Sequence, residues 1–493
     1  MHYISTRGNC NPVRSAQAIN TGMVPQGGLF VPEFIPKIDI NSINGSYQEI
    51  AYTVLRSLLT DYTDSEINDC IAHAYNSTTF DSDQIVDITG IGNNRFLMEL
   101  YHGPTAAFKD MALQIMPYFL TYAKKKSGNS LHTVILVATS GDTGKAALEG
   151  FKNIDGISVI VFYPNGGVSE IQRLQMDTTD GLNTHVVSVR GNFDDCQTGV
   201  KEIFSDLELR ELISKNDIEF SSANSINWGR LSPQIVYYFY TYSILVKSGS
   251  IKSGEAIDFC VPTGNFGNIL AGYYAKEMSL PIRKLICASN KNNVLTDFFS
   301  TGTYNRKRDF HKTISPSMDI LISSNLERFL FEISGHDAKA VTEWYHNLGS
   351  TGSFSVSNSV KKTMDSIISA GWVDETDVLD TINKTYKDHA TIIDTHTAVG
   401  VAVADRLRTD STPVVIASTA SPYKFSCDVL NGMSEAVNAD EFAAIESLSK
   451  LSGKKIHRAV DGLRSRQVRH NKVIDINEMK ECVKSIIAGS IRR

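Results

Sequence analysis

The stretch Glu99–Gln114 reads Glu-Leu-Tyr-His-Gly-Pro-Thr-Ala-Ala-Phe-Lys-Asp-Met-Ala-Leu-Gln. Its Gly103-Pro104 pair is a turn signal, and from Phe108 onward apolar residues recur at three- and four-residue steps, which predicts a helix. Lys109 would stand at the start of that helix, where the positive end of the helix dipole lowers the pKa of an ammonium group. An amine in this position is a candidate nucleophile. The alternative is a surface lysine whose stem packs on Phe108.

Strand–helix alternation surrounds this stretch between residues 96 and 290. The apolar segments Thr133–Ala138, Ile157–Phe162 and Ala256–Val261 are predicted strands, and each is followed by a predicted helix. Continuous apolar strands in this order are typical of a parallel sheet that helices cover on both faces. The sequence therefore predicts an α/β fold, to which the late apolar strand Pro413–Ser418 also belongs.

The regions outside this alternation are predicted to be mainly helical. Residues 1–95 lack it, and Ser46–Leu59 and Asp64–Tyr75 carry helical patterns, so we expect a mainly helical N-terminal region. Lys361–Ala370 and Asn477–Ile487 are further predicted helices.

The composition is that of a globular protein with more than one domain. The 493 residues exceed what one compact core holds, and 42% hydrophobic and 21% charged residues are ordinary values. The net charge of −6 argues against a nucleic-acid partner, so any anionic ligand must be held by local donors. Seven scattered cysteines without a C-x-x-C pair indicate reduced thiols. With no secretory signal and no long apolar run, we expect a cytoplasmic protein without a membrane span.

A first candidate anion loop, Thr139–Lys145, lies between a predicted strand and a predicted helix. Free backbone N–H groups at a helix start attract anions, and Ser140 and Thr143 add hydroxyl donors. The loop is not a Walker A motif, which requires glycine where this chain has Thr139. The alternative is an ordinary helix N-cap formed by Asp142 or Thr143.

A second candidate loop, Pro262–Asn268, also joins a predicted strand to a helix. Gly264 and Gly267 let the backbone approach a ligand closely, and successive N–H groups would form a nest for a dianion. The G-x-G-x-x-G fingerprint is absent, which disfavours a dinucleotide. A structural turn that needs two glycines is the alternative.

Two polar segments complete the candidate motifs. Ser222–Arg230 precedes a long predicted helix and offers amide and guanidinium donors that suit a phosphate group. A hydrogen-bonded loop with Trp228 in the core is its alternative. Ala417–Phe425 follows the last predicted strand and offers hydroxyl groups, and an ordinary strand-to-helix turn is the alternative there.

His102–Asp110 resembles the cofactor-lysine motif of the threonine synthases, which are pyridoxal-phosphate enzymes of the tryptophan-synthase-β-like family (fold type II). The four segments above are similar to further motifs of that family and occur in the expected order. Tyr3–Gly8 and Gly27–Pro32 also resemble its N-terminal domain. The resemblance implies a mainly helical N-terminal domain and two cofactor-binding α/β domains with parallel sheets covered by helices. The predicted divisions are residues 1–95, 96–250 and 251–493, with the chain free to cross between the two α/β domains.

The resemblance also implies an activity, the conversion of O-phospho-L-homoserine and water to L-threonine and phosphate, with pyridoxal 5′-phosphate as the cofactor. Lys109 would hold the cofactor covalently and then, as a free amine, move protons. The other implied cofactor contacts are Phe108, Gly264, Asn265, Phe266, Gly267, Asn268 and, at the pyridine nitrogen, Thr419. The implied substrate contacts are Ser140, Gly141, Asp142 and Thr143 near the α-carboxylate, and Asn227 and Arg230 with Lys145 near the leaving phosphate.

Two features limit what the resemblance carries over. Many relatives carry asparagine where this chain has Asp142, while threonine synthases have aspartate; Asp142 would then contact the carboxylate's donors or the cofactor and not the carboxylate itself. Many also read His-Pro-Ala-Lys-Phe where this chain has Ser421 and Tyr423, so no role of that histidine transfers.

Three hypotheses for the function stay open at this point. They are a threonine synthase, a relative that acts on an unphosphorylated amino acid, such as a serine/threonine dehydratase, and a non-catalytic phosphometabolite-binding protein. No H-E-x-x-H motif or His/Cys cluster supports a catalytic metal. We expect a small-molecule substrate, no nucleic-acid or membrane partner, and a monomer or homodimer.

Overall fold

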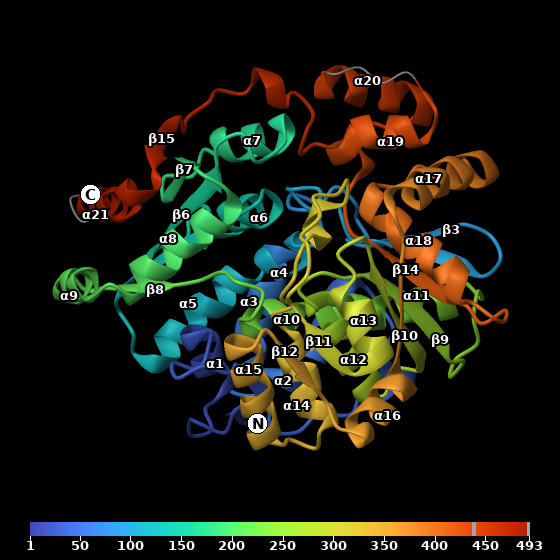
Figure 1. Ribbon diagram of the computed structural model, residues 1–493, viewed down its shortest axis with the longest axis horizontal. Coiled ribbons are helices and arrows are strands. Elements are labelled where there is room, and N and C mark those ends of the chain that lie inside the picture. Colours follow the sequence, from blue (N-terminus) through green and yellow to red (C-terminus); the bar gives the residue numbers. More distant parts are fainter. Residues whose placement is uncertain (436–439, 491–493) are drawn as a thin grey trace.

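The structure, a computed structural model, describes residues 1–435 and 440–490. Two sheets form its centre (Figure 1). The larger has the order β13 (Ile368–Trp372), β10 (Ile282–Ser289), β9 (Ile257–Pro262), β14 (Val414–Ser418), β4 (Arg95–Glu99) and β3 (Asp87–Gly90). The smaller has the order β15 (Lys472–Asp475), β7 (Thr184–Arg190), β6 (Ile157–Pro164), β5 (His132–Ala138) and β8 (Ile218–Ser221). Except for the antiparallel β3–β4 pair, neighbouring strands in both sheets run parallel, which confirms the predicted fold class.

The remaining elements are helices, 3₁₀ turns and two antiparallel strand pairs. Before residue 250 the helices are α1 (Ser15–Thr21), α2 (Tyr47–Leu58), α3 (Asp64–Ala74), α4 (Asp110–Leu113), α5 (Met116–Ser127), α6 (Asp142–Phe151), α7 (Glu170–Asp177), α8 (Phe193–Ser205), α9 (Leu207–Lys215), α10 (Trp228–Leu231) and α11 (Pro233–Lys247). Those that follow are α12 (Gly267–Glu277), α13 (Val294–Thr301), α14 (Leu326–Ile333), α15 (Ala338–Ser350), α16 (Asn358–Ile367), α17 (Glu375–His389), α18 (Thr395–Leu407), α19 (Ser426–Gly432), α20 (Glu441–Ser452) and α21 (Met479–Ser490). The 3₁₀ turns are η1 (Ile40–Ser42), η2 (Pro316–Met318), η3 (Pro422–Phe425), η4 (Leu463–Ser465) and η5 (Ile476–Glu478), and the strand pairs are β1 (Tyr3–Ser5) with β2 (Phe30–Pro32) and β11 (Thr303–Asn305) with β12 (Ser353–Ser355).

The strands are apolar on both sides because helices cover both faces of each sheet. In β6, Ile160 and Phe162 join a buried cluster with residues of α8, whereas Val159 and Val161 join another with residues of α6. Successive residues of a strand point to opposite faces, so α6 and α8 lie on opposite sides of the smaller sheet (Figure 1). This is the arrangement that continuous apolar strands predict.

The chain crosses between the two sheets on both sides of the predicted boundary at residue 250. β4 pairs with β14 of the larger sheet, and β15 pairs with β7 of the smaller one. Each sheet is thus assembled from segments far apart in the sequence. The domain boundaries at residues 95 and 250 stay a prediction.

The structure differs from the sequence-based expectation at Lys361–Ala370. The helix α16 ends at Ile367, and the next residues form the edge strand β13, which pairs with β10. The open edge of β10 supplies hydrogen-bond partners that no local pattern reveals. The helix expected from Phe108 onward is likewise divided into α4 and α5, because Pro117 in the first turn of α5 has no N–H to continue the ladder.

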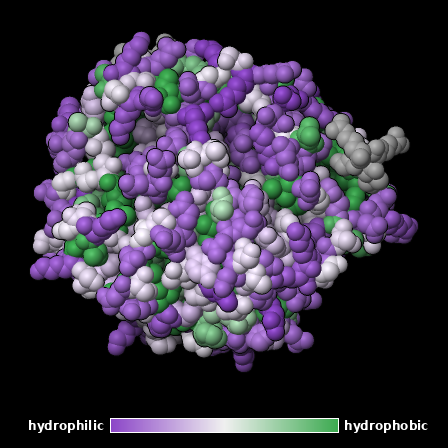
Figure 2. Space-filling model, turned by 180° about the vertical axis from the view of Figure 1, so that it is seen from behind, coloured by the Kyte–Doolittle hydropathy of each residue, from purple (hydrophilic) through white to green (hydrophobic). Residues whose placement is uncertain are grey.

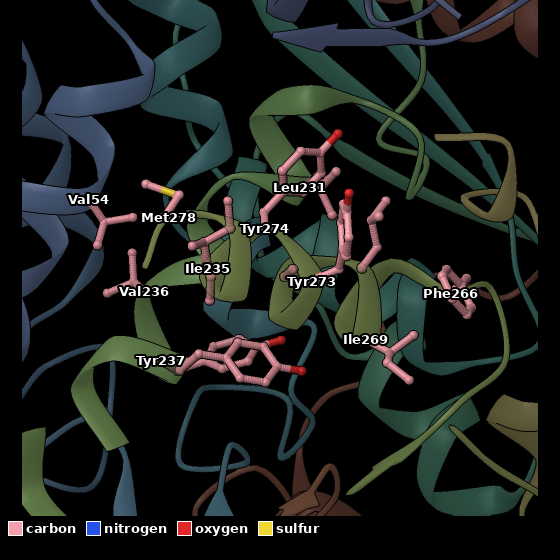
Figure 3. Close-up of a cluster of buried hydrophobic side chains, with 14 of the residues drawn as sticks. Val54, Leu231, Ile235, Val236, Tyr237, Phe266, Ile269, Tyr273, Tyr274 and Met278 are labelled. Carbon is pink, nitrogen blue, oxygen red and sulfur yellow. The ribbon is translucent and has the colours of Figure 1, made fainter. Parts of the chain in front are cut away.

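The N-terminal region shares its core with the helices α11 and α12. Figure 3 shows Val54 of α2 beside Val236 of α11 and Met278, within a buried cluster that continues through Tyr274. The fully buried Trp228 stacks at a tilt on Tyr3 of β1, with ring centroids 5.2 Å apart. The first residues of the chain therefore help to fix α10, the helix that begins at Trp228.

The face of the molecule seen in Figure 2 is mostly hydrophilic, and hydrophobic residues occur on it in small separate groups. Among the residues that the structure describes, no helix has both the length and the apolar character needed to cross a bilayer.

His102 connects three parts of the chain through ion pairs. Its Nδ1 lies 3.0 Å from a carboxylate oxygen of Asp81, and its Nε2 lies 3.2 Å from Glu99 and 3.4 Å from Asp87. Asp81 also faces Nε2 of His457, from the C-terminal part, at 3.2 Å. Burial disfavours the charged imidazolium, but the hydrogen bonds to Asp81 and Glu99 outweigh it and raise the pKa of His102 to about 9.

We predict that His102 stabilises the fold in a pH-dependent manner. Its folded pKa lies above the ordinary value of 6.5, so its contribution is complete below about pH 6.5 and is lost as the pH rises through about 9. Between roughly pH 6 and pH 10, the free energy of unfolding measured with urea should fall by about 3 kcal/mol more in the wild type than in His102→Gln. His346→Gln, on the exposed side of α15, is the matched control and should follow the wild type. Identical pH dependence in wild type and His102→Gln would contradict the prediction.

Candidate active site

The carboxyl ends of β4, β14 and β9 meet at one edge of the larger sheet. The chain that follows these strands contains Lys109, Thr419 and Gly264, respectively. The backbone N–H of Phe108 donates to the carbonyl oxygen of Thr419 at 2.8 Å. The segment that carries Lys109 is thus docked on the segment that carries Thr419, at the edge where parallel sheets bind ligands.

The turn before Lys109 is fixed by Asp110, whose side chain is completely buried. Its carboxyl group accepts hydrogen bonds from the backbone N–H of Thr105 at 2.8 Å and from the hydroxyl of Thr105 at 2.9 Å. A Cβ atom at Gly103 would lie 2.4 Å from Cβ of Asp110, so only glycine fits there. Burial raises the pKa of Asp110 to about 7, although the bonds from Thr105 oppose the shift.

The side chain of Lys109 is 11% exposed, and its amine is only loosely paired. Its Nζ lies 3.4 Å from Oδ2 of Asp142 and 3.5 Å from Oγ of Ser317. Burial lowers the pKa of Lys109; Asp142 opposes this shift, and the positive charges of Lys424 and Arg230 add to it. A larger fraction of this amine is therefore uncharged, and so nucleophilic, than in a solvent-exposed lysine.

Asp142, the first residue of α6, is the carboxylate at the centre of the site. Its Oδ1 accepts from Lys424 at 2.5 Å and from Gln172 at 3.1 Å, and its Oδ2 accepts from Ser317 at 3.2 Å. Burial opposes its ionisation, but the ammonium groups of Lys424 and Lys109 outweigh burial and hold the pKa of Asp142 far below its usual range. The carboxylate therefore stays ionised.

The start of α6 is capped, but by neither of the two residues, Asp142 and Thr143, that the sequence suggested. The hydroxyl of Thr139 accepts hydrogen bonds from the N–H groups of Gly141 and Gly144, both at 3.0 Å. Asp142 and Thr143 do not act as the cap, since Gly141 is the N-cap residue. Gly141 has a φ of 134°, and a Cβ there would lie 2.5 Å from the side chain of Gln172. Of the other predicted contacts in this loop, Ser140 is exposed and Thr143 is half-buried.

The loop after β9 approaches the same site through Ser317. A Cβ at Gly264 would lie 2.8 Å from the carbonyl oxygen of Ser317, and the hydroxyl of Ser323 donates to the carbonyl oxygen of Gly264 at 2.7 Å. Because the hydroxyl of Ser317 also contacts Lys109 and Asp142, the amine and the Gly264 turn are both in contact with one residue. They are close enough for a molecule of the size of pyridoxal phosphate to touch both.

Phe266 contributes only its backbone to this loop. It has a left-handed φ of 63° just before α12, and its ring packs on Phe299 and Phe329 in the core. The left-handed residue turns the chain so that the N–H groups at the start of α12 face the loop, as in an anion-binding nest.

Asn268 and Asn265 lie on either side of Phe266 and differ in what they offer. Oδ1 of Asn268 accepts hydrogen bonds from Tyr237 and Tyr238, while its Nδ2 is buried without a partner among the described residues. The carbonyl oxygen of Asn265 accepts from the N–H of Asn325 at 3.1 Å. A buried amide donor without an acceptor, next to a glycine turn, fits a phosphate group at this place.

Two residues predicted to hold the substrate are engaged elsewhere. Asn227 is the N-cap of α10: its Oδ1 accepts from the N–H of Gly229 at 2.8 Å, and its Nδ2 donates to the carbonyl oxygen of Ile19 at 3.0 Å. Lys145 pairs with Glu149 and donates to Thr179 at 3.1 Å. Asn227 therefore supports its own loop, and the contacts of Lys145 are with Glu149 and Thr179.

Arg230 differs from these two because its charge is unmatched. Arg230 is 5% exposed, and its Nη1 donates to the carbonyl oxygen of Ala223 at 2.7 Å. No carboxylate in the described part of the chain forms an ion pair with it, and burial lowers the pKa of Arg230 to about 10. Since its charge also acts on Lys109, Arg230 is a buried cation close to the amine and open to an anion.

Sequence reasoning missed several residues of the site. Ser317 lies in η2, in a region without regular periodicity, and its N–H donates to Nε2 of His396 at 3.1 Å. Nδ1 of His396 lies 2.8 Å from the buried Asp394, which fixes the ring. Lys424 stands within the quoted segment Ala417–Phe425, but nothing in the local pattern indicates that it is buried. Only the packing of remote segments reveals these roles.

A lysine amine with a lowered pKa, beside a glycine turn and at the carboxyl edge of parallel strands, is the arrangement expected of a pyridoxal-phosphate enzyme of fold type II. In agreement, residues 75–419 match the family model described as "Pyridoxal-phosphate dependent enzyme". Residues 2–75 match "Threonine synthase N terminus", and residues 397–484 match "Threonine synthase, C-terminal". The chain belongs to the threonine synthase family, and its cofactor is pyridoxal phosphate.

Individual relatives agree with this placement. The chain is 41% identical over 436 residues to human "Threonine synthase-like 1", covering 85% of this chain and 58% of that protein. It is 37% identical over 487 residues to "Threonine synthase" of Saccharomyces cerevisiae, covering 91% and 93%. The crystal structure of pyridoxal-phosphate-bound threonine synthase from Brucella melitensis superposes with a TM-score of 0.86 at 35% identity, covering 99% of both chains. The chain thus spans little more than half the length of the human relative and nearly all of the microbial ones.

We predict that Gly264→Ala weakens cofactor binding without unfolding the protein. The added Cβ would meet a backbone carbonyl oxygen at 2.8 Å, so η2 must move and carry Ser317 away from Lys109. The dissociation constant for pyridoxal phosphate, measured by titrating the apoprotein and following its absorbance, should rise about tenfold or more. Gly349→Ala, in α15 where a Cβ meets nothing within 4 Å, is the control and should bind as the wild type does. Unchanged affinity in Gly264→Ala would show that the close approach to η2 has no part in the site.

Proposed function

We propose that this protein converts O-phospho-L-homoserine and water to L-threonine and phosphate, and is therefore a carbon–oxygen lyase acting on a phosphate ester. Membership of the threonine synthase family supports this proposal. The buried charge of Arg230 is the observation that favours a phosphorylated substrate. A buried guanidinium without a carboxylate partner is costly unless an anion joins it. A substrate with its own phosphate group suits this site better than an unphosphorylated amino acid.

Pyridoxal phosphate, when bound, supplies an electron sink that stabilises negative charge on successive carbon atoms of the substrate. The protein's own contribution begins with Lys109, whose amine is buried and has a lowered pKa. It is suited to hold the cofactor and, once released, to take the proton from Cα and to move protons at Cβ and Cγ. The loosely held amine can do this because its contacts of 3.4 and 3.5 Å leave it free to turn.

The surrounding residues would orient the two ligands. The backbone of Gly264–Asn268 and the free amide donor of Asn268 would hold the cofactor phosphate. The hydroxyl of Thr419, whose carbonyl oxygen is already used by Phe108, would meet the pyridine nitrogen. The start of α6, with Ser140 and the neighbouring backbone N–H groups, would receive the substrate carboxylate. Water must enter only when it adds at Cβ, so we expect the site to close over the substrate.

We predict that Lys109→Ala loses all turnover while it keeps its fold, because Lys109 is the amine that, among the described residues, contacts both Ser317 and Asp142. The assay follows phosphate release and L-threonine formation from O-phospho-L-homoserine, together with the visible absorbance band of the bound cofactor. Both should be absent in Lys109→Ala, and its circular dichroism should match that of the wild type. Lys125→Ala, an exposed lysine at the end of α5, is the control and should retain activity.

The same assay separates the three hypotheses. Formation of a 2-oxo acid instead of L-threonine would favour a dehydratase. Binding of O-phospho-L-homoserine without a cofactor band or any product would favour a phosphometabolite-binding protein. Either result would overturn the proposed reaction.

We predict that Arg230→Met lowers the activity on the phosphorylated substrate and leaves the binding of an unphosphorylated analogue almost unchanged. Loss of a charge-assisted contact to the phosphate should lower kcat/KM for O-phospho-L-homoserine about a hundredfold. The inhibition constant of L-homoserine, which has no phosphate group, should change little. Arg210→Met, on the exposed face of α9, is the matched control. An equal loss of affinity for both compounds would mean that Arg230 supports the fold and not the phosphate.

A further inference from the structure

Lys424 is an unusual lysine because its side chain is completely buried. It lies in η3, in the segment that follows β14, with 0% of the side chain exposed, and its Nζ lies 2.5 Å from Oδ1 of Asp142. Lysines are almost never fully buried unless they are paired. The ion pair joins η3, next to the larger sheet, to α6, next to the smaller sheet.

The two oxygens of Asp142 are divided between two amines. Oδ1 takes the short contact to Lys424, and Oδ2 faces Lys109 at 3.4 Å. Gln172 holds Oδ1 and Ser317 holds Oδ2, so the carboxylate is fixed on both sides and cannot swing fully to Lys109. The closer amine therefore takes most of the electrostatic attraction of this carboxylate.

Charged groups from every neighbouring element act on Lys109, and they do not balance. Asp142 of α6 attracts a proton to the amine, whereas Lys424 of η3 and Arg230 of α10 oppose protonation. Asp110, the first residue of α4 and next to Lys109 in the chain, is bonded to Thr105, and His396 contacts the site through Ser317. Removing Lys424 would leave Asp142 with Lys109 as its one amine partner.

We propose that Lys424 is a positioning residue that holds the carboxylate of Asp142 away from Lys109, so that Lys109 keeps an uncharged amine for the cofactor. A neighbouring cation is one of the recognised ways to activate a lysine nucleophile. The inference rests on the proposed function only in taking Lys109 as the reactive amine. It explains why this chain tolerates an acid at position 142: the acid and Lys424 together are close to neutral.

The alternative is that the Asp142–Lys424 pair only ties α6 to η3. The two roles differ in what they do to the titration of Lys109. In a purely structural role, replacing Lys424 changes stability and leaves the titration of the Lys109 amine unchanged. In the proposed role, the pKa of Lys109 moves in opposite directions when one or the other partner is removed.

The experiment measures the pKa of Lys109 in the apoprotein, without substrate. Competitive labelling with acetic anhydride at a series of pH values, read by mass spectrometry of the Lys109 peptide, gives this value directly. In Lys424→Met the pKa should rise by about one unit or more, since Asp142 then pairs with Lys109. In Asp142→Asn it should fall, since Lys424 is left as an unbalanced neighbouring cation. Lys424→Arg should stay near the wild type, and Lys125→Met is the matched control.

The double variant Asp142→Asn/Lys424→Met keeps the test decisive if a single variant does not fold. It removes both members of the Asp142–Lys424 pair together, so neither of them is left as a buried charge without the other, and the pKa of Lys109 should return close to the wild-type value. Unchanged titration in Lys424→Met, or a double variant with a pKa far from that of the wild type, would overturn the proposal. Because no substrate is used, failure to form L-threonine leaves this result standing.

Discussion

An excess of buried positive charge dominates the site. Lys424 and Arg230 are buried and the Lys109 side chain is 11% exposed, and among the described residues Asp142 is the carboxylate that pairs with the two lysines. Such an imbalance is costly, because the desolvation of each ion is only partly repaid. The imbalance has two consequences: it lowers the pKa of Lys109, and it leaves room for negative charge that a ligand brings. A cofactor with one phosphate and a substrate with another would complete what the protein leaves unpaired.

The sheets make this concentration of charge possible. Lys109 and Lys424 follow β4 and β14, which are neighbours in the larger sheet, and Asp142 follows β5 of the smaller sheet, so all three residues lie in the chain that follows a strand. Parallel strands place all their carboxyl ends on one side, and the loops there are free of the packing that the sheet interior imposes. The ion pair between Asp142 and Lys424 then joins the segment after β5 of the smaller sheet to the segment after β14 of the larger one, and the site lies between them.

The elements that the sequence predicted well are those whose own pattern decides their structure. β6 is buried on both faces, and α11 is a long apolar helix, so periodicity and length were sufficient. β13 and β15 are edge strands that exist because a neighbouring strand offers free hydrogen-bond groups, and no local pattern contains that information.

The site residues divide in the same way. Lys109 and Gly264 stand in motifs whose turn and helix signals place them at strand ends, and the structure brings their segments together around Ser317. Asn227 stands in a segment for which the sequence left open a phosphate site or a hydrogen-bonded loop with Trp228 in the core, and the structure makes it the N-cap of α10. Lys424 carried no local signal, because burial of a lysine depends on a carboxylate that lies far away in the sequence.

The net charge of the chain was the weakest guide to its ligands, and the structure explains why. A net charge of −6 repels anions at long range, but at physiological ionic strength a field is largely screened beyond about 8 Å. Inside the site the dielectric is low, so each buried cation attracts an anion far more strongly than the same charge would at the surface. The N–H groups at the starts of α6 and α12 add to this attraction without changing the net charge at all. For this chain, the sign of the net charge says nothing about the charge of its ligands, whereas a buried cation without a carboxylate partner does.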